Sequence, residues 1–196
     1  MIKNIRKVSN IRYASIREMD ISNGEGIGVA LFVQGCHFHC YNCFNPDTWD
    51  FNCGKEWTQE TEDKLIELAN RPYIKRLSIL GGEPLADENL DGVLHLVDRF
   101  RLLLPNKSIW IYSGYSFTEL FMYDDQIKKN PNYLRKDIME IYKKRQEIVK
   151  QCTVMVDGRY IDSQRDISLR WRGSKNQHVI DIQQSLYHNK IVLYQN

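Results

Sequence analysis

The sequence predicts an α/β fold in which a mainly parallel sheet forms an open, partial barrel. Strand-like and helix-like segments alternate along the chain, as expected for βαβ units with right-handed crossovers. At 196 residues, 42% of them hydrophobic, the chain can bury a core of its own and has the length of one domain. The units are too few for a closed eight-stranded barrel, so we expect one domain over residues 1–196 with an open sheet.

Strands are predicted where short apolar runs are rich in β-branched and aromatic residues. The first run covers residues 29–33 and is followed by a cysteine-rich loop. Further strands are predicted at 76–80, 108–112, 153–156, 178–182 and 191–194.

Helices are predicted between these strands, where apolar residues recur at helical spacing. The first covers 58–70, with Thr58 as its N-cap, and the second covers 87–104. Both are long enough to serve as crossover connections between parallel strands.

A third helical stretch is predicted at 117–123 and again at 133–151, with a break at Pro131. The segment at about 123–150 holds lysine and arginine clusters among apolar residues at roughly helical spacing. We expect this basic helical insertion to present a solvated face, and a docking surface is the alternative.

Three cysteines stand in one short loop directly after the first predicted strand. Cys36, Cys40 and Cys43 have the spacing C-x3-C-x2-C. A 4Fe-4S cube normally takes four cysteines, so three thiolates from this loop leave one iron open to another ligand. A structural zinc site helped by His37 and His39 is the alternative, although no second ligand pair follows at the usual distance. The odd total of five cysteines argues against a disulfide framework.

Further candidate site residues follow the next predicted strands. Ligands of such sheets lie at the carboxyl ends of the strands, where the loops meet. The second strand ends at Gly81, Gly82, Glu83 and Pro84, and the third ends at Ser113. Paired glycines let a backbone approach a ligand closely, and Glu83 can hold a cationic amine. We therefore expect these residues beside the cysteine loop.

Charge and hydropathy argue against several classes of partner. The net charge of +2 is too small to indicate a nucleic-acid-binding protein. No run is long and apolar enough to span a membrane, and the basic N-terminus lacks the apolar stretch of a signal peptide. Together with reduced cysteines, these features predict a cytoplasmic location with no membrane partner.

The motifs, taken in order, resemble those of a known family. The C-x3-C-x2-C loop followed by GGEP resembles the radical S-adenosylmethionine superfamily. Within it, five stretches are similar to the activating proteins of anaerobic, class III, ribonucleoside-triphosphate reductase. They are NPDTW (45–49), SILGGEPL (78–85), IWIYSGY (109–115), VMVDGRY (154–160) and LRWRGSKNQHVID (169–181). The last two are the most specific part of a resemblance that covers nearly the whole chain.

The resemblance implies a 4Fe-4S cluster held by the three cysteines, with the amino and carboxylate groups of S-adenosylmethionine on its fourth iron. The implied ligands of the cluster are Cys36, Cys40 and Cys43. The implied contacts with S-adenosylmethionine are Gly81, Gly82 and Glu83 for the methionine amino group, Ser113 for the ribose, and the backbone around Asn42 and Phe44 for adenine. Many relatives carry an aromatic residue at the position of Asn42, so the adenine contact expected here is made through the backbone.

The resemblance also implies an activity. One-electron cleavage of S-adenosylmethionine yields methionine and a 5′-deoxyadenosyl radical, which removes hydrogen from a backbone glycine of the large reductase subunit. The implied partners are this large subunit and a low-potential electron donor such as flavodoxin. The reaction needs no acid or base on this chain, and no catalytic residue beyond the cluster ligands is evident.

Two other functions compete with this one. The chain could activate another glycyl-radical enzyme such as pyruvate formate-lyase, or it could be an iron-sulfur electron carrier or redox sensor. Arg170, Arg172 and Lys175 either anchor a carboxylate, dock the reductase or form a basic surface loop. Cys53 and Cys152 fit neither the ligand spacing nor a pair, and we interpret them as free thiols.

Overall fold

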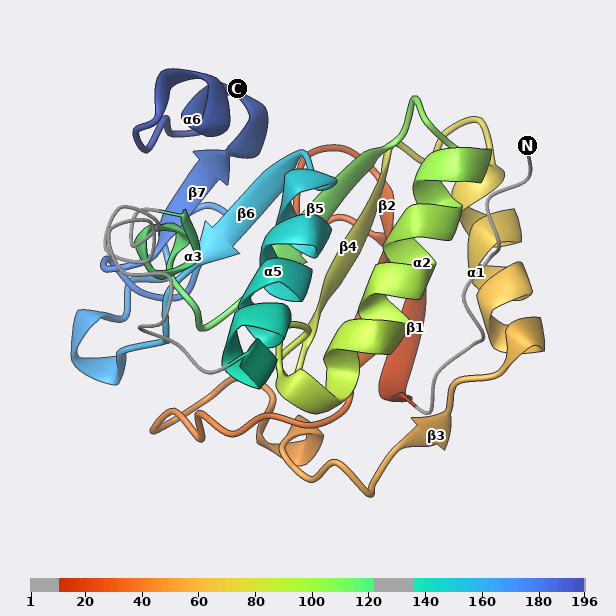
Figure 1. The fold of residues 1–196 in the computed structure, drawn as a ribbon, viewed down its shortest axis with the longest axis horizontal. Coiled ribbons are helices and arrows are strands. Elements are labelled where there is room, and N and C mark those ends of the chain that lie inside the picture. Colours follow the sequence, from red (N-terminus) through yellow and green to blue (C-terminus); the bar gives the residue numbers. More distant parts are fainter. Residues whose placement is uncertain (1–10, 122–135, 196) are drawn as a thin grey trace.

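The structure is a computed structural model that describes residues 11–121 and 136–195. Within these ranges one sheet has the strand order β3-β1-β2-β4-β5-β6-β7. The strands are β1 (Arg12–Asp20), β2 (Gly28–Val33), β3 (Lys55–Glu56), β4 (Arg76–Gly81), β5 (Ser108–Tyr112), β6 (Val154–Asp157) and β7 (His178–Asp181). The middle strands β2, β4, β5 and β6 are parallel, while β1, β3 and β7 pair antiparallel with their neighbours. The fold is therefore α/β with a mixed sheet (Figure 1).

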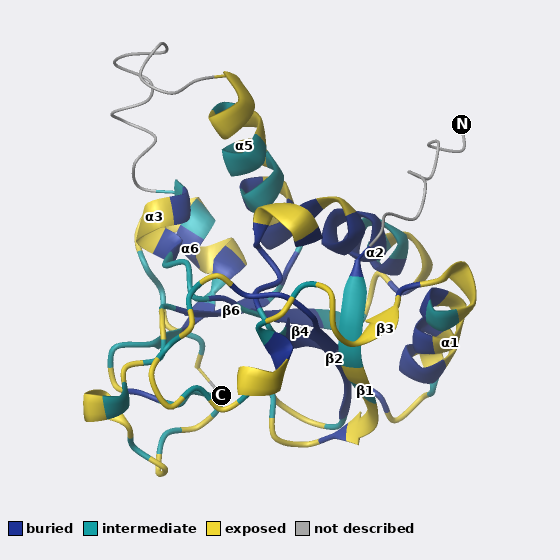
Figure 2. Ribbon diagram, turned by 90° about the horizontal axis from the view of Figure 1, so that it is seen from below, coloured by how far each residue is buried: buried dark blue, intermediate teal, exposed yellow. Residues whose placement is uncertain are grey.

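The helices lie on one side of this sheet (Figure 2). They are α1 (Gln59–Asn70), α2 (Leu90–Leu103), α3 (Phe117–Phe121), α5 (Lys136–Lys150) and α6 (Ile182–His188), with 3-10 turns η1 (Pro46–Thr48), η2 (Asp87–Asn89) and η3 (Asp162–Gln164). The predicted N-cap of α1 is confirmed, because the side chain of Thr58 accepts a hydrogen bond from the backbone N–H of Thr61. No helix in the described ranges is long and apolar enough to cross a bilayer.

Most of the predicted elements are confirmed, and α3 and α5 are the described parts of the third helical stretch. Residues 122–135, which include the predicted break at Pro131, lie outside the described residues. The strand predicted at 191–194 is wrong, because this segment makes only an isolated bridge between Leu193 and Ile180. Strands β1 and β3 and helix α6 were not predicted. Strand β1 carries arginine and glutamate on partly exposed positions, so it lacks the apolar run of the buried strands.

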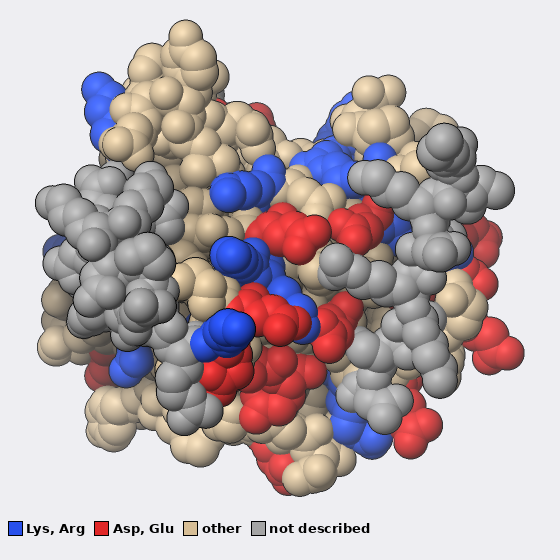
Figure 3. All heavy atoms as spheres, viewed as in Figure 1, with Lys and Arg blue, Asp and Glu red and all other residues tan. Residues whose placement is uncertain are grey.

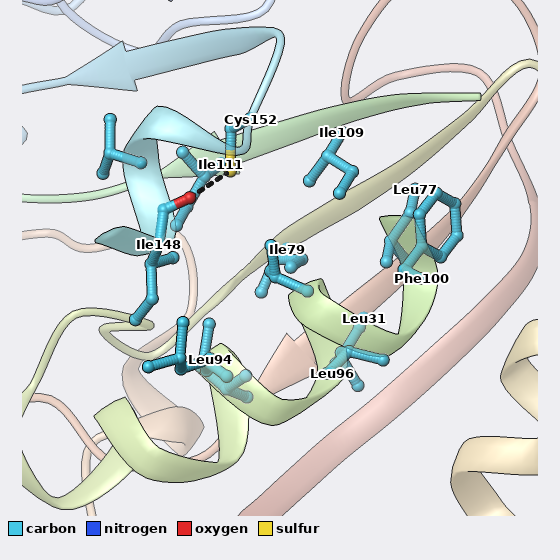
Figure 4. Close-up of a cluster of buried hydrophobic side chains, with 14 of the residues drawn as sticks. Leu31, Leu77, Ile79, Leu94, Leu96, Phe100, Ile109, Ile111, Ile148 and Cys152 are labelled. Carbon is cyan, nitrogen blue, oxygen red and sulfur yellow. Dashed lines mark hydrogen bonds between the residues drawn. The ribbon is translucent and has the colours of Figure 1, made fainter. Parts of the chain in front are cut away.

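One face of the sheet packs against helices and forms the main core. Paired residues on neighbouring strands share a face. Leu31, Ile79, Ile111 and Met155 occupy successive paired positions across the four parallel strands, and all four are fully buried. They belong to the same core as side chains of α2 and α5, among them Leu94 (Figure 4). We call this helix-covered side of the sheet the closed face.

The opposite face carries the alternate residues of the same strands. Here Phe32 pairs with Leu80, and Tyr112 pairs with Val156. The two small apolar clusters on this face consist of strand and loop residues. Figure 2 shows the helices gathered to one side of the sheet and irregular segments on the other. This face is covered by loops rather than by helices, and it borders the cavity described in the next section.

Candidate functional site

A cavity of about 530 Å³ lies at the carboxyl ends of the parallel strands, the edge at which ligands of such sheets bind. The residues predicted from the three strand ends share it. Its walls include Cys36, Cys40, Cys43, Phe44, Gly81, Gly82, Glu83 and Ser113. The tertiary structure thus brings together segments that are up to 77 positions apart in the sequence, from Cys36 to Ser113.

The cysteine loop is closed by hydrogen bonds between its two ends. The backbone N–H groups of Gly35 and Cys36 donate to the carbonyls of Thr48 and Trp49, at 2.8 and 3.0 Å. The buried side-chain amide of Gln34 donates to two more carbonyls of the returning segment. These bonds hold the loop in place without any contribution from the cysteine side chains.

Inside the loop the chain reverses sharply. His39 and Asn42 have φ angles of 45° and 54°, in the left-handed region that non-glycine residues rarely adopt. The backbone N–H of Cys43 donates to the carbonyl of Cys40 at 3.0 Å. Only seven positions separate the first cysteine from the last, and these turns let all three border the same cavity.

The three thiols fit an iron-sulfur cube. Cys36 is buried, and burial raises the pKa of its thiol to about 11; burial likewise raises the pKa of Cys40. A bound cation reverses this effect, because metal ligation favours the thiolate. Within the described residues, no three His, Cys, Asp or Glu side chains converge on one point as the ligands of a single ion do. A cube binds each thiolate through a separate iron, so its cysteines need not converge in that way.

The glycine pair packs against the cysteine loop. The backbone N–H of Gly82 donates to Val33 at 2.9 Å, and that of Glu83 donates to Gly35 at 2.7 Å. A Cβ atom on Gly82 would lie 2.4 Å from the carbonyl oxygen of Gly35, which is closer than carbon and oxygen can approach. The absence of a side chain at Gly82 therefore lets the turn after β4 touch the residue that precedes Cys36.

Glu83 and Ser113 are bound to each other. The carboxylate of Glu83 accepts hydrogen bonds from the Ser113 hydroxyl at 2.8 Å, from the backbone N–H of Gly114 at 2.7 Å and from that of Leu85 at 2.8 Å. Glu83 is buried, and burial raises its pKa to about 7 despite these three donors. The carboxylate thus links the ends of β4 and β5 across the floor of the cavity.

Two supporting residues were missed by sequence reasoning. The buried side-chain amide of Asn89, in η2, donates to the carbonyls of Gln34 and Glu83 and so joins the cysteine loop to the glycine turn. Arg145, in α5, donates to the carbonyl of Leu85 at 2.9 Å and to the hydroxyl of Tyr115 at 2.8 Å. No local pattern marks either residue, because both act through partners far along the chain.

The two residues expected near adenine have different positions. Phe44 lines the cavity, and its ring meets the edge of Tyr160 at 5.0 Å between centroids. Asn42 is exposed and is not among the residues that line the cavity. Neither candidate histidine lines the cavity: His37 is 2.8 Å from Glu88, and His39 stacks on Trp49, which does line it.

The basic residues near the end of the chain separate into two groups. Arg172 lines the cavity and donates to the carbonyl of Gln177 at 2.7 Å. Lys175 lies outside the cavity lining and pairs with Asp166 at 3.6 Å. Arg159, at the end of the fourth predicted strand, also lines the cavity, with its guanidinium 4.3 Å from the centre of the Phe38 ring.

The two remaining cysteines are free thiols, as predicted. Cys152 is fully buried in the core and donates to the carbonyl of Ile148 at 3.3 Å (Figure 4). Cys53 is exposed and donates to Asp50 at 3.2 Å.

Comparison with known proteins places these features in a family. Residues 22–180 match the family model described as a 4Fe-4S single cluster domain. A protein of Vibrio cholerae named anaerobic ribonucleoside-triphosphate reductase-activating protein is 37% identical over 169 residues, which are 85% of this chain and 96% of the relative. Proteins of the same name from Escherichia coli K12 and Enterobacteria phage T4 are 35% and 30% identical over 85% of this chain, and the matches span 96% and 92% of those proteins.

Proposed function

The chain belongs to the family of anaerobic ribonucleoside-triphosphate reductase-activating proteins, and on this premise we propose how its residues carry out the activation. It is a glycyl-radical activase that uses a 4Fe-4S cluster and S-adenosylmethionine and acts on the large reductase subunit. When bound, the cluster supplies the electron that splits S-adenosylmethionine into methionine and the 5′-deoxyadenosyl radical that removes hydrogen from a reductase glycine.

Cys36, Cys40 and Cys43 are the proposed ligands of the cluster. They are the cysteines that border the cavity, while Cys53 and Cys152 lie elsewhere. The buried position of Cys36 limits the access of water to the metal, and low exposure is one of the properties through which a protein sets the potential of an iron-sulfur centre.

Gly81, Gly82, Glu83 and Ser113 are the proposed contacts of the methionine and ribose groups. Since Glu83 already accepts three hydrogen bonds, it orients the turn and adds negative charge rather than offering a free acceptor. A cationic amine beside it would lower its pKa and favour the ionised carboxylate. Phe44, and the backbone around Asn42, would then contact adenine at the other side of the cysteine loop.

We also propose the finer features of the fold and of the partners. The mixed sheet, with helices on one face and a cavity on the other, supports an open, partial barrel of the radical S-adenosylmethionine type in a single domain. A low-potential donor such as flavodoxin would deliver the electron. Photoreduced flavodoxin should therefore support cleavage in place of a chemical reductant, and failure to do so would exclude that donor.

The observation that carries the proposal is the convergence of three thiols, the glycine turn and Ser113 on one cavity. The test is anaerobic reconstitution with iron and sulfide, followed by chromatographic measurement of 5′-deoxyadenosine. We expect its release to require both a reductant and S-adenosylmethionine. With the reductase added, electron paramagnetic resonance should show a glycyl radical, and a reductase variant whose radical-bearing glycine is replaced by alanine should show none. A protein with a full cluster that releases no 5′-deoxyadenosine would contradict the proposed function.

A further inference from the structure

Several exposed apolar side chains lie close in sequence to residues that line the cavity. Those that lie within two positions of a residue lining the cavity are Met19, Ile21, Tyr41, Phe44, Ile161 and Ile167. Ile167 is the most exposed of them, with 90% of its surface accessible. A single exposed apolar side chain is common on protein surfaces, so the place of Ile167 in the fold decides whether its exposure is informative.

Ile167 stands at the tip of the loop between β6 and β7, which we call the tongue (residues 158–177). The two sides of the tongue pair with each other: Arg165 and Ser174 form a β-bridge, and the N–H of Lys175 donates to Gln164 at 2.9 Å. At the tip, the carboxylate of Asp166 accepts from the backbone N–H and the hydroxyl of Ser168, at 2.9 and 2.6 Å. The exposed isoleucine is thus presented by an ordered turn.

The tongue is fixed to the cysteine loop. The ring of Phe44 meets that of Tyr160, and it lies so near Gly173 that a Cβ atom there would be 2.6 Å from it. Leu169 and Arg172 of the tongue line the cavity. The tip therefore stands at the mouth of the cavity in which the thiols lie.

From this placement we propose that Ile167 is an apolar anchor by which the chain docks onto the large reductase subunit. The inference rests on the proposed function, because a radical formed in the cavity reaches a glycine of another protein only if that protein covers the mouth. The tongue tip then becomes part of the interface. A rigid, exposed isoleucine fits an apolar pocket on the partner, and such anchors carry a large share of binding energy.

The test compares two exposed apolar residues on the reconstituted holoprotein. Ile167→Asp changes the tongue tip. Tyr187→Asp is the matched control: Tyr187 is 84% exposed, but it lies in α6, which follows the antiparallel strand β7 and so stands at the opposite edge of the sheet. A third variant, Ile167→Leu, keeps the apolar character. Each is assayed for reductase binding, for glycyl radical yield and for uncoupled cleavage of S-adenosylmethionine.

We expect Ile167→Asp to weaken binding by about tenfold or more, the range of interface anchors, and to lower radical yield at limiting reductase in proportion. Uncoupled cleavage should stay at the wild-type rate. Tyr187→Asp and Ile167→Leu should bind as the wild type does. The defect should change little with salt, because an apolar contact is not screened.

Binding of Ile167→Asp within about twofold of the wild type would overturn the anchor, as would an equal loss of uncoupled cleavage, which would assign the tip to the cavity instead. Failure of the wild type itself to cleave S-adenosylmethionine would contradict the proposed function. The two failures are therefore distinguishable in the same experiment.

Discussion

The two faces of the sheet are built differently. The helix-covered face holds a row of fully buried aliphatic side chains across the four parallel strands. The other face borders the cavity, and three of the four described non-glycine residues with positive φ, namely His39, Asn42 and Trp171, lie in the loops around it.

The closed face mainly stabilises the fold, and the cavity face holds the candidate site. Backbone in the left-handed region lowers stability for residues other than glycine and persists where a site needs it. The closed apolar face contributes the stability that the cavity face lacks. Substitutions on the two faces should therefore differ in kind: those on the closed face should change unfolding alone, while those on the cavity face should also change cofactor binding and cleavage.

Charged side chains are intermixed on the outer surface of the helical layer. Figure 3 shows Lys and Arg next to Asp and Glu over α2 and α5. Lys144 pairs with Asp91 at 3.0 Å, and Arg145 pairs with Asp87. In the described part of the predicted basic insertion, these bases thus face acids of the neighbouring helix. Both bases are thus engaged within the molecule, which argues against the docking interpretation for them.

The largest effect is expected from the cluster ligands. Cys36→Ala, Cys40→Ala and Cys43→Ala should each abolish cleavage of S-adenosylmethionine, because each removes one of three thiolates. Cys53→Ala and Cys152→Ala should retain most of it. Iron analysis and 5′-deoxyadenosine release measure the outcome, and an equal loss in Cys53→Ala would show that the ligand set is wrong.

The next effect is expected at the glycine turn. Gly82→Ala should already lower the iron content and the cleavage rate, because the added Cβ displaces the backbone of Gly35 and with it the cysteine loop. Gly82→Val should add little further loss. Iron content and S-adenosylmethionine affinity should fall together. Full iron content with weakened affinity would instead show that Gly82 lets S-adenosylmethionine approach the backbone closely.

A substitution on the closed face should act on stability alone. Leu94→Ala removes a fully buried side chain from the helix-covered core and should lower the free energy of unfolding by about 2–5 kcal/mol. Cleavage per mole of bound cluster should stay unchanged. Denaturant unfolding and normalised activity measure the two quantities, and a fall in normalised activity would break the separation between the faces.

A smaller change in stability is expected at the link between the strand ends. In Glu83→Gln, an amide nitrogen replaces an acceptor oxygen, so at least one of the donors at Ser113, Gly114 and Leu85 loses its partner. We expect a loss of about 1–3 kcal/mol in the free energy of unfolding, together with weaker binding of S-adenosylmethionine. Binding and stability equal to those of the wild type would show that the link is dispensable.

A final effect is expected from pH, at the same carboxylate. Because the pKa of Glu83 is raised from 4.5 to about 7 in the folded chain, the folded state keeps a proton that the unfolded state has released between these values. The free energy of unfolding should therefore fall as pH rises from about 4.5 to 7. Outside that window the contribution of Glu83 should not change with pH. Subtracting the profile of cluster-free Glu83→Gln from that of the cluster-free wild type isolates the contribution, and an absent or opposite slope would argue against the raised pKa.

Local patterns in the sequence were sufficient for the middle of the sheet. The runs that became β2, β4, β5 and β6 are mostly apolar because these strands are largely buried, and such runs are recognisable without knowledge of the fold. The rule that ligands lie at the carboxyl ends of parallel strands then selected the cysteine loop, the glycine turn and Ser113. Strand β1 escaped detection because its solvated positions carry charged residues.

The sequence by itself therefore determined the parallel middle of the sheet, the three cysteines and the strand ends around them, since spacing and periodicity are local properties of the chain. Only the tertiary structure decided that Glu83 is bound to Ser113 and that Asn89 joins the two loops. It also decided that Arg172 faces the cavity while Lys175 does not. These arrangements depend on which strands become neighbours and on which face the helices cover. Contacts between distant residues form only once the chain has packed, so no local pattern encodes them.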